Sequence, residues 1–183
     1  MTLEEYQAKK NEILHIISIK EIIGNTNCDD PLKCATCKGK NCCQHFPCAF
    51  SPEEFLDINN TSYMLKILKT GLIVIAKLPI NIPYIRIRGI NDPPKIVTNT
   101  NEAGNPCSLL SNNGCLLNSL FRPTEALLTT PMTCTSNYTA EQLIDDWKKH
   151  KKPMRKLIKE CKDIDVDTTV QDIENYKRLI ISL

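Results

Sequence analysis

Apolar and polar positions along the chain predict two helices before the first β-prone segment. Residues 2–23 place apolar side chains at near-helical spacing between charged ones, and the following Gly24-Asn25 is a stop signal. The run SPEE at 51–54 predicts a second helix start. Its serine can cap the helix, its proline suits the first position, and its last glutamate can close a capping box. We expect this helix to be interrupted at residues 59–60 and to resume over residues 63–71.

A β-prone block follows these helices. Runs rich in β-branched residues stand at 72–78, 84–90 and 95–98, with prolines between them. In the second run apolar residues alternate with Arg86 and Arg88. Such alternation is typical of a strand with one face in water. We therefore expect a small antiparallel sheet with both arginines on its solvated face.

A further turn signal lies between two cysteines. The pair Asn113-Gly114 stands between apolar pairs, and both central residues of a type I′ hairpin turn need positive φ. The predicted hairpin carries Cys107 on one strand and Cys115 just past the turn. The turn could therefore bring these two thiols close together.

The C-terminal region, 139–183, has a helical pattern. Thr139 with Gln142 forms a capping box for one helix, which Pro153 should kink or split. A second box, Thr168 with Gln171, predicts the start of the last helix. The expected fold class is therefore α+β: a mainly helical single domain with a small antiparallel β element and an irregular cysteine-rich loop.

Length and composition indicate one domain over residues 1–183, with a cysteine-cluster region at 28–134 ahead of the helical region. The formal net charge is only +2, so a nucleic-acid partner, which favours a strongly basic face, is not expected. No segment approaches the roughly 20 apolar residues of a membrane span, and the N-terminus lacks the basic and apolar regions of a signal peptide. We expect a cytoplasmic protein without a membrane partner.

Ten cysteines are the one unusual feature of the composition. In a reducing compartment, clustered thiols bind metal more often than they form disulfides. The alternative is a secreted domain stapled by disulfides. An even cysteine count and three Asn-x-Ser/Thr sequons, at Asn59, Asn60 and Asn137, are compatible with it.

Six of the cysteines lie between Cys28 and Cys48, in a polar stretch that has too few apolar residues for a core of its own. Cys34 and Cys37 have the two-residue spacing that lets both sulfurs turn toward one ion. The same spacing occurs in redox motifs, but those favour a strand-to-helix junction, and this pair follows a predicted helix in a loop. The pattern therefore indicates a metal knuckle.

The neighbouring cysteines Cys42 and Cys43 add a constraint. Adjacent side chains of an extended chain point to opposite sides, so the two do not easily serve one tetrahedral ion. Cys28 and Cys161 are set aside, and His45 is a further possible ligand. The remaining thiols suffice for two four-cysteine sites or one iron–sulfur cluster: Cys34, Cys37, Cys42, Cys43, Cys48, Cys107, Cys115 and Cys134.

These residues resemble the CxxCxxCC zinc- or iron-chelating domain family, the YkgJ-like cysteine-cluster proteins, which is also found within flagellin lysine-N-methylase-like proteins. The matching features are Cys34-x2-Cys37, the pair Cys42-Cys43, the helix start at 51–54, Cys107-x-x-Leu, Gly114-Cys115 and Arg122-Pro123. The resemblance implies metal or iron–sulfur binding but no particular reaction.

Two positions depart from this family pattern. Four residues, not two, separate Cys37 from the cysteine pair, and alanine stands at 126, where the family has a cysteine after Arg-Pro. Either an insertion lets Cys134 take that role, or the site lacks this ligand.

The leading hypothesis is a metal-binding protein in which a thiolate-ligated zinc ion or iron–sulfur cluster joins the 34–48 loop to the 107–134 segment. A second hypothesis is a redox enzyme, or a protein-modification component related to lysine methylation, that uses such a cluster. Neither a Gly-rich nucleotide loop nor a hydrolase motif accompanies the cysteines. The sequence therefore assigns no reaction and no protein partner.

Overall fold

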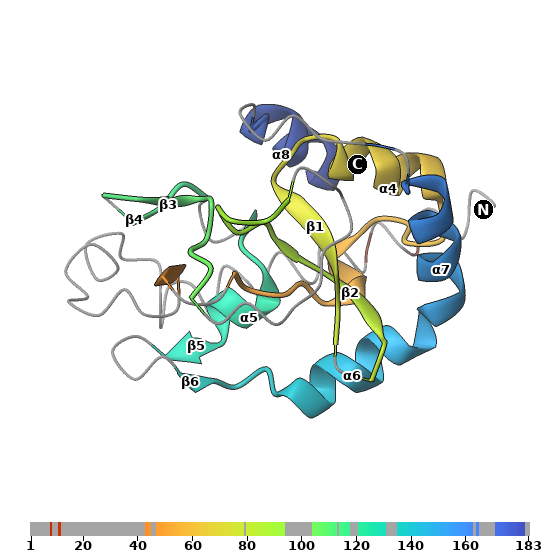
Figure 1. Cartoon of the computed structure of the whole chain (residues 1–183), viewed down its shortest axis with the longest axis horizontal. Coiled ribbons are helices and arrows are strands. Elements are labelled where there is room, and N and C mark those ends of the chain that lie inside the picture. Colours follow the sequence, from red (N-terminus) through yellow and green to blue (C-terminus); the bar gives the residue numbers. More distant parts are fainter. Residues whose placement is uncertain are drawn as a thin grey trace.

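The computed structural model of the chain places small two-stranded sheets among helices (Figure 1). It describes residues 8, 11, 43–44, 47–78, 80–93, 104–112, 114–117, 121–130, 135–162, 164 and 171–181. Within this part of the chain the α+β class predicted from the sequence is confirmed. Ala8 and Asn11 are helical, and the rest of the helix predicted over 2–23 lies outside the described residues.

The central element is the antiparallel hairpin of β1 (Ile73–Lys77) and β2 (Pro83–Ile87). Its register pairs Ile75 with Ile85. The connecting turn contains Asn81 at φ 58°, in the left-handed region that asparagine tolerates better than most residues. These strands confirm the first two predicted β runs, and the third, at 95–98, lies outside the described residues.

A short extended segment runs along the other side of β2. Ala49 pairs with Arg86 in an antiparallel bridge, and Phe50 N donates to Ile85 O at 3.0 Å. Ile87 N donates to Cys48 O at 3.0 Å. The exit of the cysteine-rich loop is therefore fixed to the central hairpin by backbone hydrogen bonds.

The helix start predicted at 51–54 is shorter than expected. Glu54 accepts a hydrogen bond from Ser51 N at 2.7 Å, as the capping box requires, but only the 3₁₀ turn η2 (Pro52–Glu54) forms. The predicted continuation to residue 59 is wrong. Helix α4 (Thr61–Leu68) begins afresh, where Asn60 caps it by accepting from Tyr63 N at 3.1 Å.

The C-terminal helices largely follow the sequence signals. Thr139 and Gln142 exchange side-chain and backbone hydrogen bonds at the start of α6 (Ala140–Lys149). The helix then breaks, and α7 (Lys151–Glu160) carries Pro153 in its first turn. Proline lacks the N–H that would bond to the carbonyl four residues back, so the predicted split is confirmed.

The start of α8 (Ile173–Ile181) differs from the prediction. Asp172 caps it by accepting from Asn175 N at 3.0 Å, so Gln171 lies outside the helix. Thr168, the predicted cap, lies outside the described residues. Asp172 N also donates to Thr70 O at 3.0 Å, which ties the helix start to the end of α4.

The remaining elements are short. They are β3 (Leu110–Ser111), β4 (Gly114–Cys115), α5 (Thr124–Leu127), β5 (Thr129–Thr130) and β6 (Thr135–Ser136). The pairs β3–β4 and β5–β6 are antiparallel. In Figure 1 both pairs lie at the end of the molecule away from α7.

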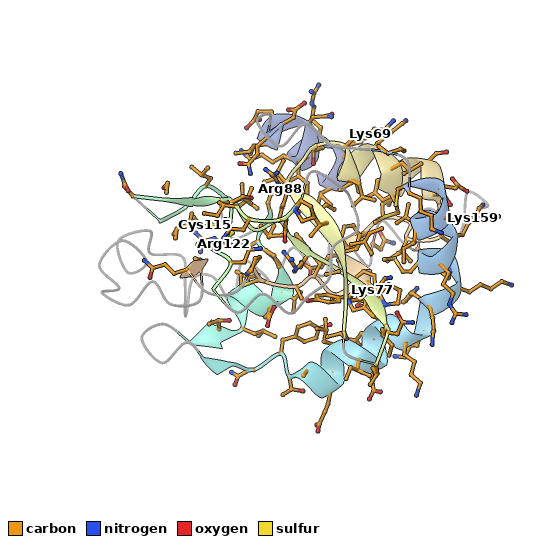
Figure 2. The ribbon with its side chains drawn as sticks, viewed as in Figure 1. Lys69, Lys77, Arg88, Cys115, Arg122 and Lys159 are labelled. Atoms are coloured by element: carbon orange, nitrogen blue, oxygen red, sulfur yellow. The ribbon has the colours of Figure 1, made fainter. Side chains whose placement is uncertain are left out.

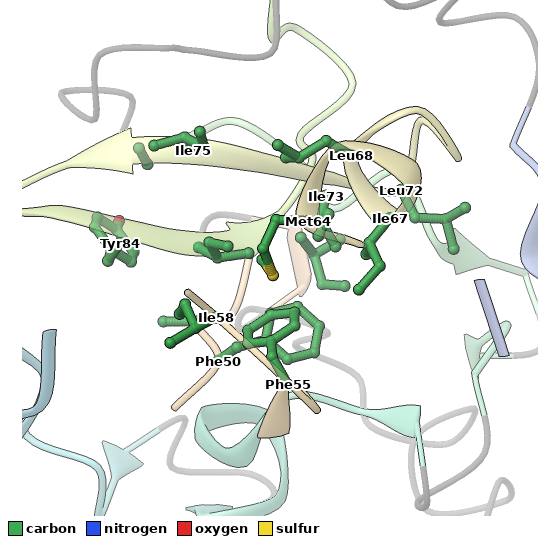
Figure 3. Packing of buried hydrophobic residues seen from close by; sticks show 14 of the residues in the cluster. Phe50, Phe55, Ile58, Met64, Ile67, Leu68, Leu72, Ile73, Ile75 and Tyr84 are labelled. Atoms are coloured by element: carbon green, nitrogen blue, oxygen red, sulfur yellow. The ribbon is translucent and has the colours of Figure 1, made fainter. Parts of the chain in front are cut away.

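The core lies between the central hairpin and the helices. In Figure 3, Met64 and Ile67 of α4 lie above Phe50 and Phe55, and Leu68 lies level with the strand that carries Ile75. Trp147 of α6 is fully buried and donates from Nε1 to Phe50 O at 2.8 Å. This core fixes the Phe50 backbone, two residues after Cys48.

Arg86 and Arg88 correct a prediction, because both are buried rather than on a solvated face. Their exposed fractions are 4% and 5%. The Arg86 guanidinium forms a two-pronged ion pair with Asp92, at 2.8 Å for each nitrogen–oxygen contact. The alternating pattern predicts the strand correctly, but every residue of β2 is buried, and Asp92 pairs with Arg86 on the polar face.

No helix among the described residues is long and apolar enough to cross a membrane.

The buried ion pair should dominate the stability of this region. Replacing Asp92 by alanine leaves the Arg86 cation buried without its carboxylate, which should cost about 3–5 kcal/mol. The matched control is Glu174→Ala, which removes the more exposed Lys177–Glu174 pair at 2.8 Å and should cost under about 1 kcal/mol. Urea unfolding of both variants measures this difference. Equal losses for both would contradict the role given to Asp92.

Candidate metal centre

Four of the predicted ligands fall in the described part of the chain: Cys43, Cys48, Cys107 and Cys115. The other five lie outside it: Cys34, Cys37, Cys42, His45 and Cys134. The described cysteines, including Cys161, are thiols. The geometry of the candidate centre is therefore built from the four described ligands and from the elements that hold them.

Cys43 and Cys107 are brought together by the backbone. Cys107 N donates to Cys43 O at 2.7 Å, although the two residues come from distant parts of the sequence. Cys107 is buried and Cys43 is half-buried against the core. The end of the cysteine-rich loop and the start of the second cysteine segment therefore lie side by side.

Cys107 is held by the central hairpin. Just beyond β2, Gly89 pairs with Cys107 in an antiparallel bridge. Two hydrogen bonds flank this bridge: Ser108 N donates to Arg88 O at 2.9 Å, and Ile90 N donates to Pro106 O at 2.8 Å. The segment around Cys107 is thus a continuation of the sheet.

A buried polar cluster fixes this continuation, and the sequence analysis missed it. Asp92 accepts from both Arg86 nitrogens, from Gly89 N at 2.7 Å and from Asn105 Nδ2 at 2.9 Å. Asn105 Oδ1 in turn accepts from Asn91 N at 2.9 Å. We call Arg86, Asp92 and Asn105 the clasp, because they join the end of β2 to the segment that carries Cys107. The only available signal was an acidic residue in a turn after a strand with two arginines.

Cys48 occupies a different position from Cys43. It is half-buried in the extended segment beside β2, one residue before Ala49. Ala49 N donates to the carboxylate of Glu125, and Glu125 N donates back to Ala49 O at 3.3 Å. Burial raises the pKa of Glu125, and the hydrogen bond from Ala49 opposes this rise. Cys48 is therefore anchored to both the hairpin and α5.

Cys115 lies on the second hairpin, where the prediction needs two corrections. Ser111 pairs with Gly114, so Gly114 opens β4 instead of standing inside the turn, and its φ is +105°. Leu110, and not Cys107, is the residue opposite Cys115. Cys107 precedes β3 and pairs with Gly89.

The sulfur of Cys115 accepts a hydrogen bond from the backbone N–H of Leu117 at 3.4 Å. Hydrogen bonds to ligand sulfurs are one of the means by which proteins tune thiolate metal sites. The described thiols are therefore ligands of the kind that a thiophilic ion such as zinc, or an iron–sulfur cluster, prefers.

Cys161 lies apart from these residues, at the end of α7. It is 2% exposed, and its thiol donates to Ile158 O at 3.7 Å. Burial raises the pKa of the thiol to about 11, a backbone hydrogen bond opposes this rise, and the charge of Glu160 adds to it. A thiol that is neutral at physiological pH fits a core residue, which agrees with its omission from the predicted ligands.

Among the described residues, no three histidine, cysteine or acidic side chains are grouped closely enough to hold a metal ion. A complete centre would need ligands from the five candidates that lie outside the described residues.

Comparison with protein-family models, with curated proteins and with solved structures finds no match to this chain.

The packing at Gly89 gives a direct test of how the Cys107 segment is held. A Cβ at position 89 would overlap the side chain of Asn105, so Gly89→Ala should displace that amide from the clasp. We expect a loss of about 1–3 kcal/mol from overpacking, plus the cost of unpaired buried groups.

The matched control is Gly104→Ala, in the same segment. Gly104 has φ +91° with nothing within 4 Å of its Cβ position, so only backbone strain of about 1–2 kcal/mol is expected there. Urea unfolding of both variants compares the two costs. A Gly89→Ala protein as stable as the wild type would show that the close approach to Asn105 is unimportant.

Proposed function

We propose that this chain is a cytoplasmic metal-binding protein in which cysteine thiolates hold a zinc ion or an iron–sulfur cluster. The bound group would join the 34–48 loop to the 107–134 segment. The observation that carries the proposal is the hydrogen bond from Cys107 N to Cys43 O, at 2.7 Å. It brings one cysteine from each segment to the same place, as a shared site requires.

The surroundings of the described thiols support this proposal. Cys43 and Cys115 are half-buried residues and Cys107 is a buried one. A partly buried cysteine whose sulfur accepts from a backbone N–H, as at Cys115, suits a bound thiophilic ion. Cys34 and Cys37, with their knuckle spacing, are the proposed source of further ligands, together with Cys42, Cys48, Cys134 and His45.

The energetics favour a structural role for the metal. A four-ligand zinc site in a peptide has an apparent binding free energy of about 10–16 kcal/mol at neutral pH. The net stability of a whole domain is only about 5–15 kcal/mol. The polar stretch between Cys28 and Cys48 has little apolar surface to bury, so metal ligation would be its main source of order.

Purification without oxygen, followed by metal and acid-labile sulfide analysis, tests the proposal. We expect either zinc without sulfide or iron with sulfide. Removal of the metal should lower the melting temperature and increase the number of thiols that a thiol-reactive reagent can titrate. A reducing compartment keeps these thiols available. Wild-type protein that is folded, metal-free and unable to take up zinc or iron would refute the function. Few titratable thiols after denaturation would instead support a disulfide-stapled domain.

Individual cysteines give the matched variants for this experiment. Cys43→Ser and Cys107→Ser should each reduce the metal bound per chain or weaken its affinity by at least tenfold. The control is Cys161→Ala, which removes a buried thiol at the end of α7 and should leave the metal content unchanged. If all three variants bound metal alike, the site could not lie between the two segments.

A further inference from the structure

Positive charge dominates the side of α7 that faces solvent. Met154, Leu157 and Cys161 are buried at helical spacing, so they fix which side of the helix faces the core. The opposite side, together with the turn that follows the helix, presents exposed cations that we call the basic face: Lys152, Arg155, Lys156, Lys159 and Lys162. Figure 2 shows Lys159 on α7 at the outer edge of the molecule, away from the β3–β4 hairpin.

The low net charge of the whole chain conceals this face. Residues 148–162 contain eight lysines and arginines and one acidic residue, Glu160, whereas the whole chain carries only +2. The remainder of the chain is therefore net acidic. The expectation of no nucleic-acid partner rested on the sum of the charges, but a phosphate backbone responds to the cations that are grouped on one surface.

The charges of α7 are arranged against the stability of the helix. Cations are unfavourable at the positive N-terminal end of a helix dipole, yet Lys151 and Lys152 stand in the first turn, which contains no acidic residue. Along the basic face, like charges recur at three- and four-residue spacing, where they repel. Lys156 lies 3.9 Å from Glu160, in the less favourable order for such a pair. A surface that serves only solubility mixes both signs, so this pattern indicates a binding role.

The positions of these charges are fixed by the packing of α7. The helix packs against α4, α6 and β2. Asp145 and Asp146, the acidic side chains that precede it, belong to α6, where Asp146 accepts from the Tyr138 hydroxyl at 2.9 Å. The basic face is therefore a preformed surface, and a partner would not have to order the helix in order to bind it.

The composition of the basic face favours nucleic acid over other acidic partners. A helix that lies on a membrane needs apolar side chains on the side that meets the lipid, and Met154 and Leu157 of α7 are turned into the core. Protein interfaces are depleted in lysine and depend on buried aromatic or arginine side chains, whereas four of the five cations here are lysines. A phosphate backbone requires neither feature, because neutralisation of the phosphates supplies the affinity.

We propose that α7 binds the phosphate backbone of duplex DNA through the basic face, without reading the base sequence. From Lys152 to Lys159 the face extends about 10 Å along the helix axis, at a rise of about 1.5 Å per residue. Duplex DNA carries one negative charge per about 1.7 Å of its axis, so several phosphates lie within that length. The face is separate from the candidate metal ligands, so this inference does not depend on the proposed function.

Two double variants, each lacking one arginine and one lysine, test the proposal. Arg155→Gln with Lys159→Gln removes two cations from the basic face. The control, Lys69→Gln with Arg178→Gln, removes the same residue types from exposed positions at the end of α4 and in α8. Fluorescence anisotropy measures how the whole chain binds a short DNA duplex of mixed sequence. At about 50 mM salt, the α7 variant should bind about tenfold more weakly, and the control should bind like the wild type.

The salt dependence gives a more specific result. The logarithm of the binding constant should fall linearly with the logarithm of the salt concentration, with a slope of about 0.9 for each phosphate neutralised. The α7 variant should therefore lose about two units of this slope, whereas the control should keep the wild-type slope. A duplex of a different sequence should bind with the same affinity.

The melting temperature separates a loss of binding from a loss of folding. Arg155 and Lys159 repel each other across one helical turn, so their replacement by glutamine should leave the melting temperature unchanged or raise it. Lys152→Gln, which removes a cation from the positive end of the helix dipole, should also weaken binding without lowering the melting temperature.

The proposal fails if the wild type does not bind the duplex at about 50 mM salt. Equal losses in the two double variants also overturn it, since net charge and not the basic face would then determine binding. Tighter binding to vesicles of phosphatidylserine and phosphatidylcholine, or to polyglutamate, than to the duplex would overturn it in favour of a membrane or an acidic protein.

Discussion

The buried ion pair between Arg86 and Asp92 is the constraint on which the rest of the arrangement depends. An arginine that is 4% exposed is costly unless its charge is matched, and here both guanidinium nitrogens meet carboxylate oxygens at 2.8 Å. Asp92 can be buried in turn because Gly89 and Asn105 supply two further donors. The pair thus requires three chain segments to be in place at once. One of these segments carries Cys107, so the same interaction that stabilises the hairpin also positions a candidate ligand.

The positions of the cysteines follow from two different kinds of interaction. Backbone pairing places Cys48 beside β2 and Cys107 beside Gly89, and Cys43, at a helical position, is tied to Cys107 by its carbonyl. Cys115 is placed by its own short hairpin and by the Leu117 peptide. The scaffold is therefore held by packing and hydrogen bonds, while the proposed metal would tie the polar loop to it.

Local signals in the sequence predicted the elements that depend on local physics. The β-branched runs predicted both strands of the central hairpin, and Thr139 with Gln142 and Pro153 predicted where α6 starts and where it ends. The burial of Arg86 and Arg88 could not be predicted in this way. A strand face exposed to solvent and one covered by other parts of the chain have the same alternating pattern of apolar and basic residues. The difference depends on Asp92, whose position is set by tertiary structure.

The candidate site shows the same limit. The cysteine pattern indicated that the loop and the 107–134 segment would share a site, and the structure brings Cys43 next to Cys107. The pairing of Cys107 with Gly89, instead of across a hairpin with Cys115, depends on the Asn105–Asp92 contact and had no signature in the sequence. Arg122 was noted only as part of a motif, since its contact with Leu117 depends on how the chain turns between them.

X-ray absorption at the metal edge of the whole chain, purified without oxygen, tests most directly whether the two cysteine segments share one thiolate-ligated centre. A thiolate-ligated metal should show sulfur scatterers at about 2.3 Å, as in cysteine-ligated zinc. The sulfur coordination number should fall in Cys107→Ser and stay unchanged in Cys161→Ala. A shell made only of nitrogen and oxygen, or a sulfur shell that Cys107→Ser leaves intact, would contradict a centre shared by the two cysteine segments.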